Sequence, residues 1–213
     1  MDFFYGRVSG NSARSAFALY ESGAPFTAHP LDTPSGENRK AEYLALNPMG
    51  KVPALIDGEL QLWESNAINW YVAEKHPAAG LLPASLGGRA SVQRWMFFQA
   101  GHLSPVSLPI FRATNRMVQR HWKVGGDPST LGPAYQELGR YLAVLEAALG
   151  GRDWLEGDFS LADIAYAPHF WMLAQVEPAL DLTPTPNVKA WLERLWNRPA
   201  WPRAVAATLS AEV

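Results

Sequence analysis

Two short motifs carry residue types that could bind an extended peptide: Lys51-Val52-Pro53 and, eleven residues after this proline, Glu64-Ser65. Pro53 begins a short apolar run, and proline at the first position of a strand gives up its own ladder hydrogen bond. An X–Pro bond in a tight turn can be cis, which would leave the backbone of Val52 free to pair with a ligand. Ser65 is a natural N-cap for the apolar residues that follow, and the positive end of a helix attracts a carboxylate. A peptide with a carboxylate would fit both motifs.

The ordered combination of these motifs resembles the thioredoxin-like domain of the glutathione transferase superfamily. In that family the residue before a cis-proline pairs with the backbone of glutathione, and an acid–Ser pair holds its γ-glutamyl end. The resemblance covers essentially all 213 residues and is strongest in the first 80. It implies glutathione as co-substrate, bound by Lys51, Val52, Pro53, Glu64 and Ser65.

The turn that follows the first predicted strand is the candidate catalytic segment. Family members place there the group that contacts the glutathione sulfur, and this group is Tyr, Ser or Cys. Ser9 lies in the loop and we choose it as the hydroxyl, with Asn11 as its partner, because Ser-x-Asn resembles bacterial members of the family. Ser12 and Tyr5 are the alternatives, although Tyr5 falls within the strand. Ser, Gly and Asn are also the residues that any strand-to-helix turn would use.

The chain contains no cysteine, so any thiol chemistry must use a bound thiol. A free thiol has a pKa near ~8.5, and only a few per cent of it is thiolate at neutral pH. A hydroxyl at Ser9, the amide of Asn11 and the positive end of the first helix would each stabilise the thiolate. Catalysis would then consist of lowering the thiol pKa and holding the electrophile close to the sulfur.

Composition excludes several other classes of function. The net charge of −2 gives no long-range attraction to nucleic acid or to an anionic membrane. No apolar run approaches the length of a membrane span, and the N-terminus lacks the pattern of a signal peptide, so we expect a cytoplasmic protein. The five histidines show no metal-ligand spacing, and no glycine-rich phosphate loop is present, so we expect neither a metal nor a nucleotide.

The elements that must position these residues change character near residue 80. Strand-like runs cover 2–5 and 26–31, helix-like runs cover 12–21 and about 37–46, and Asp57-Gly58 turns a hairpin between 53–56 and 60–63. After a linker rich in Gly and Pro, predicted helices cover about 87–123, 131–149, 161–176, 187–197 and 199–209. The predicted fold class is therefore an α/β thioredoxin-like domain over residues 1–80 and an all-α domain over residues 86–213.

Three features of the predicted helical domain bear on substrate and stability. The resemblance places an acceptor-substrate pocket beside its long first helix, where His102 is a candidate binding residue and Pro105 and Pro109 should cause kinks. Arginines at 112, 116 and 120 would form one basic stripe, which is either a solvated face or a contact for an anionic ligand. Ser160 and Asp163 form a capping box, with a structural role, at the start of a core helix.

Three functions remain compatible with these residues. The first is a glutathione transferase that conjugates glutathione to small hydrophobic electrophiles, as in detoxification. The second is a glutathione-dependent disulfide-bond reductase or peroxidase. The third is a glutathione-binding or regulatory protein without turnover, against which the Ser-x-Asn pattern argues mildly. The resemblance also implies a homodimer.

Overall fold

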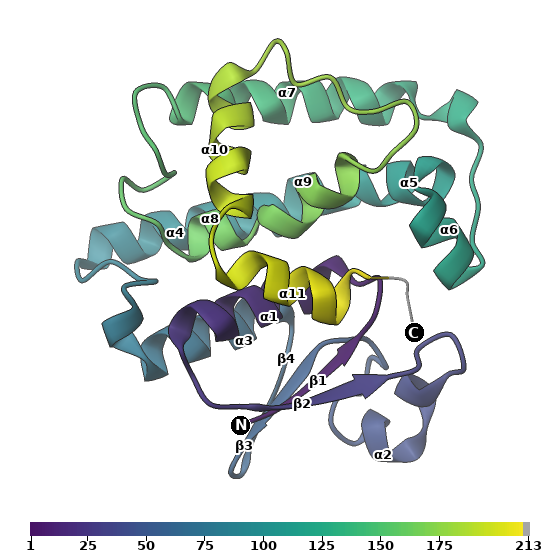
Figure 1. Ribbon diagram of the computed structural model, residues 1–213, viewed down its shortest axis with the longest axis vertical. Coiled ribbons are helices and arrows are strands. Elements are labelled where there is room, and N and C mark those ends of the chain that lie inside the picture. The colour runs from purple at the N-terminus through teal and green to yellow at the C-terminus, as the bar shows by residue number, and fades with distance from the viewer. Residues whose placement is uncertain (211–213) are drawn as a thin grey trace. The chain divides into compact units, whose positions relative to one another are not determined.

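The computed structural model describes residues 1–210, which form two compact units. The first unit contains Met1–Leu81 and the chain from Pro199 onward, and the second contains Leu82–Arg198. The elements of the first unit are β1 (Asp2–Gly6), α1 (Gly10–Ser22), β2 (Thr27–Leu31), α2 (Ala41–Leu44), β3 (Ala54–Asp57), β4 (Leu60–Trp63), α3 (Ser65–Lys75) and α11 (Ala200–Thr208) (Figure 1). Those of the second are α4 (Leu86–Phe98), a π-helical turn (Gln99–Leu103), α5 (Ser104–Thr114), α6 (Arg116–Trp122), α7 (Gly132–Ala148), α8 (Leu161–Ile164), α9 (Ala167–Leu173) and α10 (Pro186–Trp196).

The first unit is built on a four-stranded sheet with the order β2-β1-β3-β4. β1 and β2 are parallel, whereas β3 runs antiparallel to both β1 and β4. The predicted β3–β4 hairpin forms, but its two loop residues are Gly58, with a φ of 61°, and Glu59, because Asp57 still pairs with Leu60; the turn is one residue later than predicted. This mixed sheet with its helices confirms the predicted α/β thioredoxin-like fold class.

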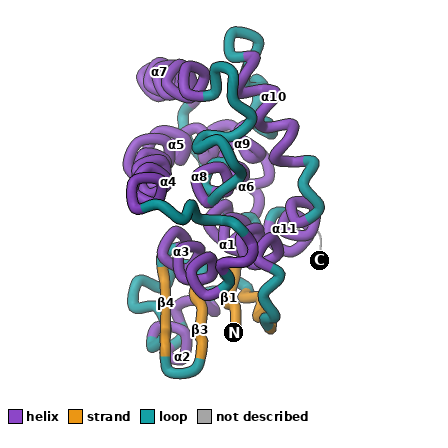
Figure 2. The backbone as a smooth tube through the Cα atoms, turned by 90° about the vertical axis from the view of Figure 1, so that its left-hand side faces the viewer, coloured by secondary structure: helices purple, strands orange, loops and turns teal. Residues whose placement is uncertain are grey.

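Helix α1 forms the centre of the first unit and lies next to both α3 and α11 (Figure 2). Its residues 12–19 are all buried, and Phe17 packs edge-on against Trp201 of α11 with ring centroids 5.3 Å apart. Residues 199–209 were expected to belong to the helical domain. The apolar face of α11 is instead covered by α1 of the first unit.

The second unit is entirely helical among its described elements, as predicted. The expected single helix over 87–123 is divided, because α5 ends at Thr114 and Asn115 adopts an extended conformation. The Asn115 side chain accepts a hydrogen bond from the Val118 amide at 3.1 Å and donates one to the Met172 carbonyl at 2.9 Å. Asn115 is thus the N-cap of α6, and a second irregularity, the π-helical turn over Gln99–Leu103, lies directly before Pro105.

The helix break also changes the predicted arginine stripe. Arg112 belongs to α5, whereas Arg116 and Arg120 belong to α6, so the three do not share one continuous helical face. Arg116 forms an exposed ion pair with Glu177 at 2.6 Å. An exposed pair of this kind contributes at most about 1 kcal/mol to stability.

Candidate functional site

The predicted catalytic residues lie where the β1–α1 loop joins helix α1. Ser9 is the N-cap of α1, and its half-buried hydroxyl oxygen accepts a hydrogen bond from the Ser12 amide at 3.2 Å. The Ser9 amide donates to the carbonyl of Thr208 in α11 at 3.3 Å, so the C-terminal helix helps to fix the loop. Asn11 lies in the first turn of α1 with its side chain exposed. Both residues therefore lie at the positive end of a 13-residue helix.

The loop residue Val8 has an unusual backbone conformation. Its φ is +51°, although its side chain is β-branched and only 2% exposed. Such a conformation costs on the order of 1–3 kcal/mol and persists only where the surrounding structure enforces it. Outliers of this kind cluster at functional sites, and this one directly precedes Ser9.

Ser12 and Tyr5, the alternative thiol-contacting residues, are both in the core. Ser12 is 0% exposed, and its hydroxyl oxygen accepts a hydrogen bond from the Gly6 amide at 3.2 Å. Tyr5 is buried in β1 and stacks on Phe3 with ring centroids 5.6 Å apart. Burial raises the pKa of Tyr5, which keeps this phenol protonated. Of the three hydroxyls, that of Ser9 is the one whose residue is partly exposed.

The peptide bond between Val52 and Pro53 is cis, as its place in a tight turn suggested. Pro53 is buried, and the pairing of β3 with its neighbours begins at Ala54. Val52 is therefore outside the ladder, next to the first paired residue, and its side chain is half-buried. This is the position at which an extended ligand could continue the pairing of the sheet.

The segment before Val52 is held by side chains that donate to its backbone. The Lys51 carbonyl accepts hydrogen bonds from the Tyr43 hydroxyl and from the Asn47 amide, each at 2.6 Å. Burial raises the pKa of Tyr43 to about 12, so the phenol remains a donor at any physiological pH. Gly50 completes the turn with a φ of 58°, where a side chain would be strained. The Lys51 side chain itself is exposed.

The start of α3 differs in one respect from its prediction. The N-cap is Glu64, with φ 69° and ψ 113°, and Ser65 is the first residue of the helix, so the assignment of Ser65 as N-cap is wrong. The Ser65 hydroxyl oxygen accepts a hydrogen bond from Arg14 Nη1 at 2.8 Å. The Glu64 side chain is exposed and makes no capping hydrogen bond within the described chain. Its carboxylate and the first amides of α3 can thus face a ligand.

Sheet topology brings these segments to one end of the sheet. Phe4 of β1 pairs with Ala54 of β3, so the loop that follows β1 lies beside Val52. A Cβ placed on Gly6 would come within 2.9 Å of the Val52 side chain, which shows how closely this side chain approaches the backbone of Gly6. Trp63 at the end of β4 also pairs with Ala54, so the start of α3 follows at the same end. Seven of the eight predicted site residues therefore lie in one region of the first unit.

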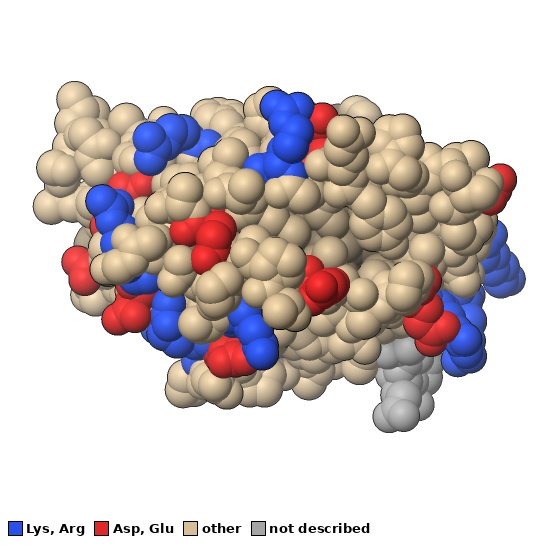
Figure 3. Space-filling model, turned by 90° about the horizontal axis from the view of Figure 1, so that it is seen from above, with Lys and Arg blue, Asp and Glu red and all other residues tan. Residues whose placement is uncertain are grey.

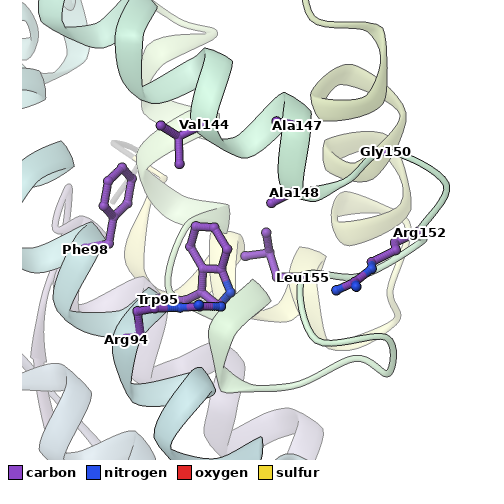
Figure 4. Close-up of a pocket in the computed structure, with 9 residues that line it drawn as sticks. All are labelled: Arg94, Trp95, Phe98, Val144, Ala147, Ala148, Gly150, Arg152 and Leu155. Carbon is purple, nitrogen blue, oxygen red and sulfur yellow. The ribbon is translucent and has the colours of Figure 1, made fainter.

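His102, the eighth predicted residue, belongs to the second unit. It is exposed in the π-helical turn, and its ring contacts those of Phe98 and Tyr141 at centroid distances of 5.3 and 5.8 Å. Phe98 lines a cavity of about 500 Å³ between α4 and the end of α7 (Figure 4). Trp95 and Val144 contribute further apolar surface to this cavity, and His102 is not among its lining residues.

Sequence reasoning missed Arg14, which is 3% exposed in the middle of the site's polar contacts. A charged residue among the small and apolar residues 12–19 of a core helix was the available signal, since a buried guanidinium needs partners. It also missed Tyr43 and Asn47, which position Lys51 through its backbone. Both donors are close to Lys51 in the sequence, but no fixed spacing of residue types indicates a side chain that donates to a loop carbonyl.

Charge is mixed over the face of the molecule shown in Figure 3, where Lys and Arg alternate with Asp and Glu. Within residues 1–210, no group of three or more His, Asp or Glu side chains is placed to hold a metal ion. No helix in that same range is both long and apolar enough to cross a membrane.

Comparison with known proteins gives consistent matches along the chain. Family models described as the glutathione S-transferase N-terminal and C-terminal domains match residues 1–74 and 133–199. Glutathione S-transferase 3 of Zea mays is 36% identical over 208 residues, covering 94% of this chain and 90% of the relative. The crystal structure of glutathione transferase F7 from Populus trichocarpa has a TM-score of 0.88 at 30% identity, covering 98% of this chain and 99% of its own. The theta class enzyme of Xanthomonas axonopodis pv. citri, solved with glutathione bound, has a TM-score of 0.84 at 31% identity over 98% of both chains.

Proposed function

This chain belongs to the glutathione S-transferase family, and we propose that it activates the thiol of glutathione for attack on small hydrophobic electrophiles. The observation that carries the proposal is the convergence of the Ser9 loop, Val52 and the Glu64-Ser65 pair at one end of one sheet. These segments are up to 56 residues apart in the sequence, from Ser9 to Ser65, and are adjacent because of strand pairing. A thiol site and a peptide-binding site therefore share one surface.

In this proposal the first unit binds the peptide part of glutathione. The backbone of Val52, next to Pro53, pairs with the ligand as an added strand would. Glu64 and Ser65 hold the γ-glutamyl end, where the carboxylate of Glu64 suits an ammonium group and the start of α3 suits a carboxylate. The exposed ammonium of Lys51 supplies a further positive charge to the anionic peptide.

Ser9 and Asn11 act on the sulfur. A Ser9 hydroxyl that already accepts from the Ser12 amide keeps its own hydrogen for donation to the thiolate. The Asn11 amide and the N-terminus of α1 add positive potential at the same point. Each hydrogen bond to a charged sulfur stabilises it by about 1.5–3 kcal/mol, so two such bonds can lower the thiol pKa by one unit or more.

The chemical step follows from this activation. The thiolate attacks the electrophilic carbon, a carbon–sulfur bond forms, and a leaving group such as halide departs with its electron pair. The protein need not form a covalent intermediate, because catalysis consists of thiolate stabilisation and proximity. Thiolate attack does not call for a metal, and the proposal includes none. In this proposal His102 contributes to binding the acceptor substrate. The protein acts in the cytoplasm.

The proposal includes a homodimer. Both units expose large apolar side chains, among them Met49 and Trp63 in the first and Phe97 and Val144 in the second. Phe97 is 73% exposed, which is unusual for a phenylalanine on a helix of a monomeric protein. Association of two copies would remove such surface from water.

A panel assay of purified protein with glutathione tests the function. The acceptors are an aryl halide, hydroxyethyl disulfide and an organic hydroperoxide, each measured for wild type, Ser9→Ala and the exposed control Ser129→Ala. We expect turnover of the aryl halide, reduced about tenfold to a hundredfold at neutral pH in Ser9→Ala and kept in Ser129→Ala. If only the disulfide or the hydroperoxide is turned over, the protein is a glutathione-dependent reductase or peroxidase and not a conjugating enzyme. If no acceptor is turned over, it is a glutathione-binding protein without turnover.

A further inference from the structure

A buried arginine lies beneath the proposed glutathione site. Arg14, in the second turn of α1, is 3% exposed, and its Nη1 donates a hydrogen bond to Ser65 Oγ at 2.8 Å. Ser65 is itself 4% exposed. Removing a guanidinium from water costs several kcal/mol unless it gains compensating interactions, so a position of this kind calls for a reason beyond packing.

The contact is part of a wider connection between α1 and α3. Ser15 Oγ donates to the Ser65 carbonyl at 3.3 Å, and Asn69 Nδ2 donates to the Arg14 carbonyl at 3.4 Å. Ser65 is therefore held through both its side chain and its backbone. Its hydroxyl cannot drift toward another rotamer without breaking the contact with Arg14.

The hydrogen-bond chemistry fixes the direction of the Ser65 hydroxyl. A guanidinium has donors only, so Arg14 fills an acceptor position of the Ser65 oxygen and cannot accept its hydrogen. That hydrogen is left for an acceptor on the other side. The start of α3 lies at the same place and adds the positive end of an 11-residue helix. An anionic acceptor with two oxygens, a carboxylate, matches these groups.

We propose that Arg14 is a positioning residue for the α-carboxylate of the γ-glutamyl group of glutathione. It orients the Ser65 hydroxyl toward this carboxylate and places a buried positive charge behind it. This inference rests on the proposed function, because it assumes that glutathione occupies the site. The inference explains how the site recognises the γ-glutamyl end of glutathione. Arg14 contributes to this recognition without direct contact with the ligand.

A pair of ligands tests this role with the full chain. The first is glutathione and the second is 4-aminobutanoyl-Cys-Gly, which lacks only the α-carboxylate of the glutamyl group. We expect wild type to bind glutathione at least about tenfold more tightly than the analogue in calorimetric titrations. Arg14→Met should weaken glutathione binding by about tenfold to a hundredfold, the range for a hydrogen bond involving a charged group, and should leave the analogue within twofold of its wild-type affinity.

Three further variants separate positioning from general structure. Arg14→Lys, which keeps the charge but loses the planar fork, should retain part of the preference for glutathione, and it carries the test if Arg14→Met does not fold. Ser65→Ala should remove the preference, with little further loss in combination with Arg14→Met. Arg140→Met, which removes an exposed arginine of α7, should change neither affinity.

The possible outcomes distinguish the inference from the function beneath it. If wild type prefers glutathione and the Arg14 variants keep the whole preference, or lose affinity for both ligands equally, Arg14 is only a structural residue. If wild type does not bind glutathione, or binds both ligands equally, the proposed binding mode itself fails.

Discussion

Three hydroxyl groups near the first loop differ in their surroundings, and these surroundings separate their roles. Ser9 is partly exposed at the helix start, whereas Ser12 and Tyr5 are buried residues. The Ser12 hydroxyl is engaged by the buried Gly6 amide, and the Tyr5 ring packs in the core against Phe3, whereas the Ser9 hydroxyl lies at the start of α1. Residue type alone does not distinguish these cases, which is why the sequence left all three open.

Ser12→Ala is expected to affect stability and not the thiol. The Gly6 amide, which donates to the Ser12 hydroxyl at 3.2 Å, would be left buried without this acceptor. The free energy of unfolding should fall by about 1–3 kcal/mol. Urea unfolding monitored by tryptophan fluorescence measures it, and the pKa of bound glutathione should be that of wild type. A raised thiol pKa with unchanged stability would instead make Ser12 the thiol-contacting residue.

Among the elements, the capping box at the start of α8 was predicted correctly, because its signal is local. The side chains of Ser160 and Asp163 form a reciprocal capping box. In one of its hydrogen bonds the Ser160 amide donates to the Asp163 carboxylate at 3.0 Å. Asp163 also accepts from the indole of Trp191 at 2.9 Å, a contact 28 residues away that no local pattern shows. The carboxylate is 0% exposed.

Asp163 should make the stability of the protein depend on pH. Burial raises the pKa of this carboxyl to about 6, although the hydrogen bonds from Leu155, Trp191 and Ser160 oppose the shift. The folded state then holds a proton that the unfolded state releases near its ordinary pKa of 3.8. The associated stability is fully present below about pH 4 and is lost as pH rises through about 6, a change of about 3 kcal/mol.

The comparison of wild type with Asp163→Asn isolates this effect. The variant cannot titrate at position 163, so wild type should lose stability relative to it as pH rises from 4 to 6, and the difference should be constant above about pH 7. Chemical denaturation across this range gives the difference. A difference that does not vary with pH, or that varies in the opposite direction, would contradict a raised pKa.

The helix breaks were the least predictable elements. Pro105 and Pro109 were expected to kink the long helix, and a π-helical turn does precede Pro105, but the helix ends at Thr114, where no proline stands. Proline at 105 falls near the start of α5, just after the π-helical turn, where its missing amide donor is least costly. The break at Asn115 depends on the Met172 carbonyl, a tertiary contact. The type of each element was thus predictable, while its ends were set by partners distant in the sequence.

At the scale of the whole molecule, the same reasoning explains the place of α11. Its sequence predicts a helix with an apolar face, and α11 forms over Ala200–Thr208 as expected. Periodicity does not say which surface covers such a face. Here α1 covers it, and the Thr208 carbonyl accepts the amide of Ser9. Helix α11 therefore contacts the proposed catalytic loop.

The proposed homodimer should depend on the exposed apolar residues. Phe97→Asp and Val144→Glu place charges on side chains that are 73% and 46% exposed, so neither should unfold the protomer. We expect sedimentation equilibrium to show about twice the chain mass for wild type and a shift toward the chain mass of 23.5 kDa for both variants. Lys189→Glu, an exposed charge change on α10, should remain dimeric. A wild-type mass of one chain at micromolar concentrations would contradict the proposal.

The central claim is that Ser9 stabilises the thiolate of bound glutathione, and the titration of that thiol tests it most directly. Ultraviolet absorbance of the thiolate is followed against pH for glutathione bound to wild type, Ser9→Ala and the control Ser129→Ala. Removal of a donor to the anion should raise the pKa of the bound thiol by about one to two units in Ser9→Ala, with glutathione affinity nearly unchanged and the rate partly recovered at higher pH. A Ser9→Ala titration that coincides with wild type, with activity retained, would show that Ser9 is only a turn residue.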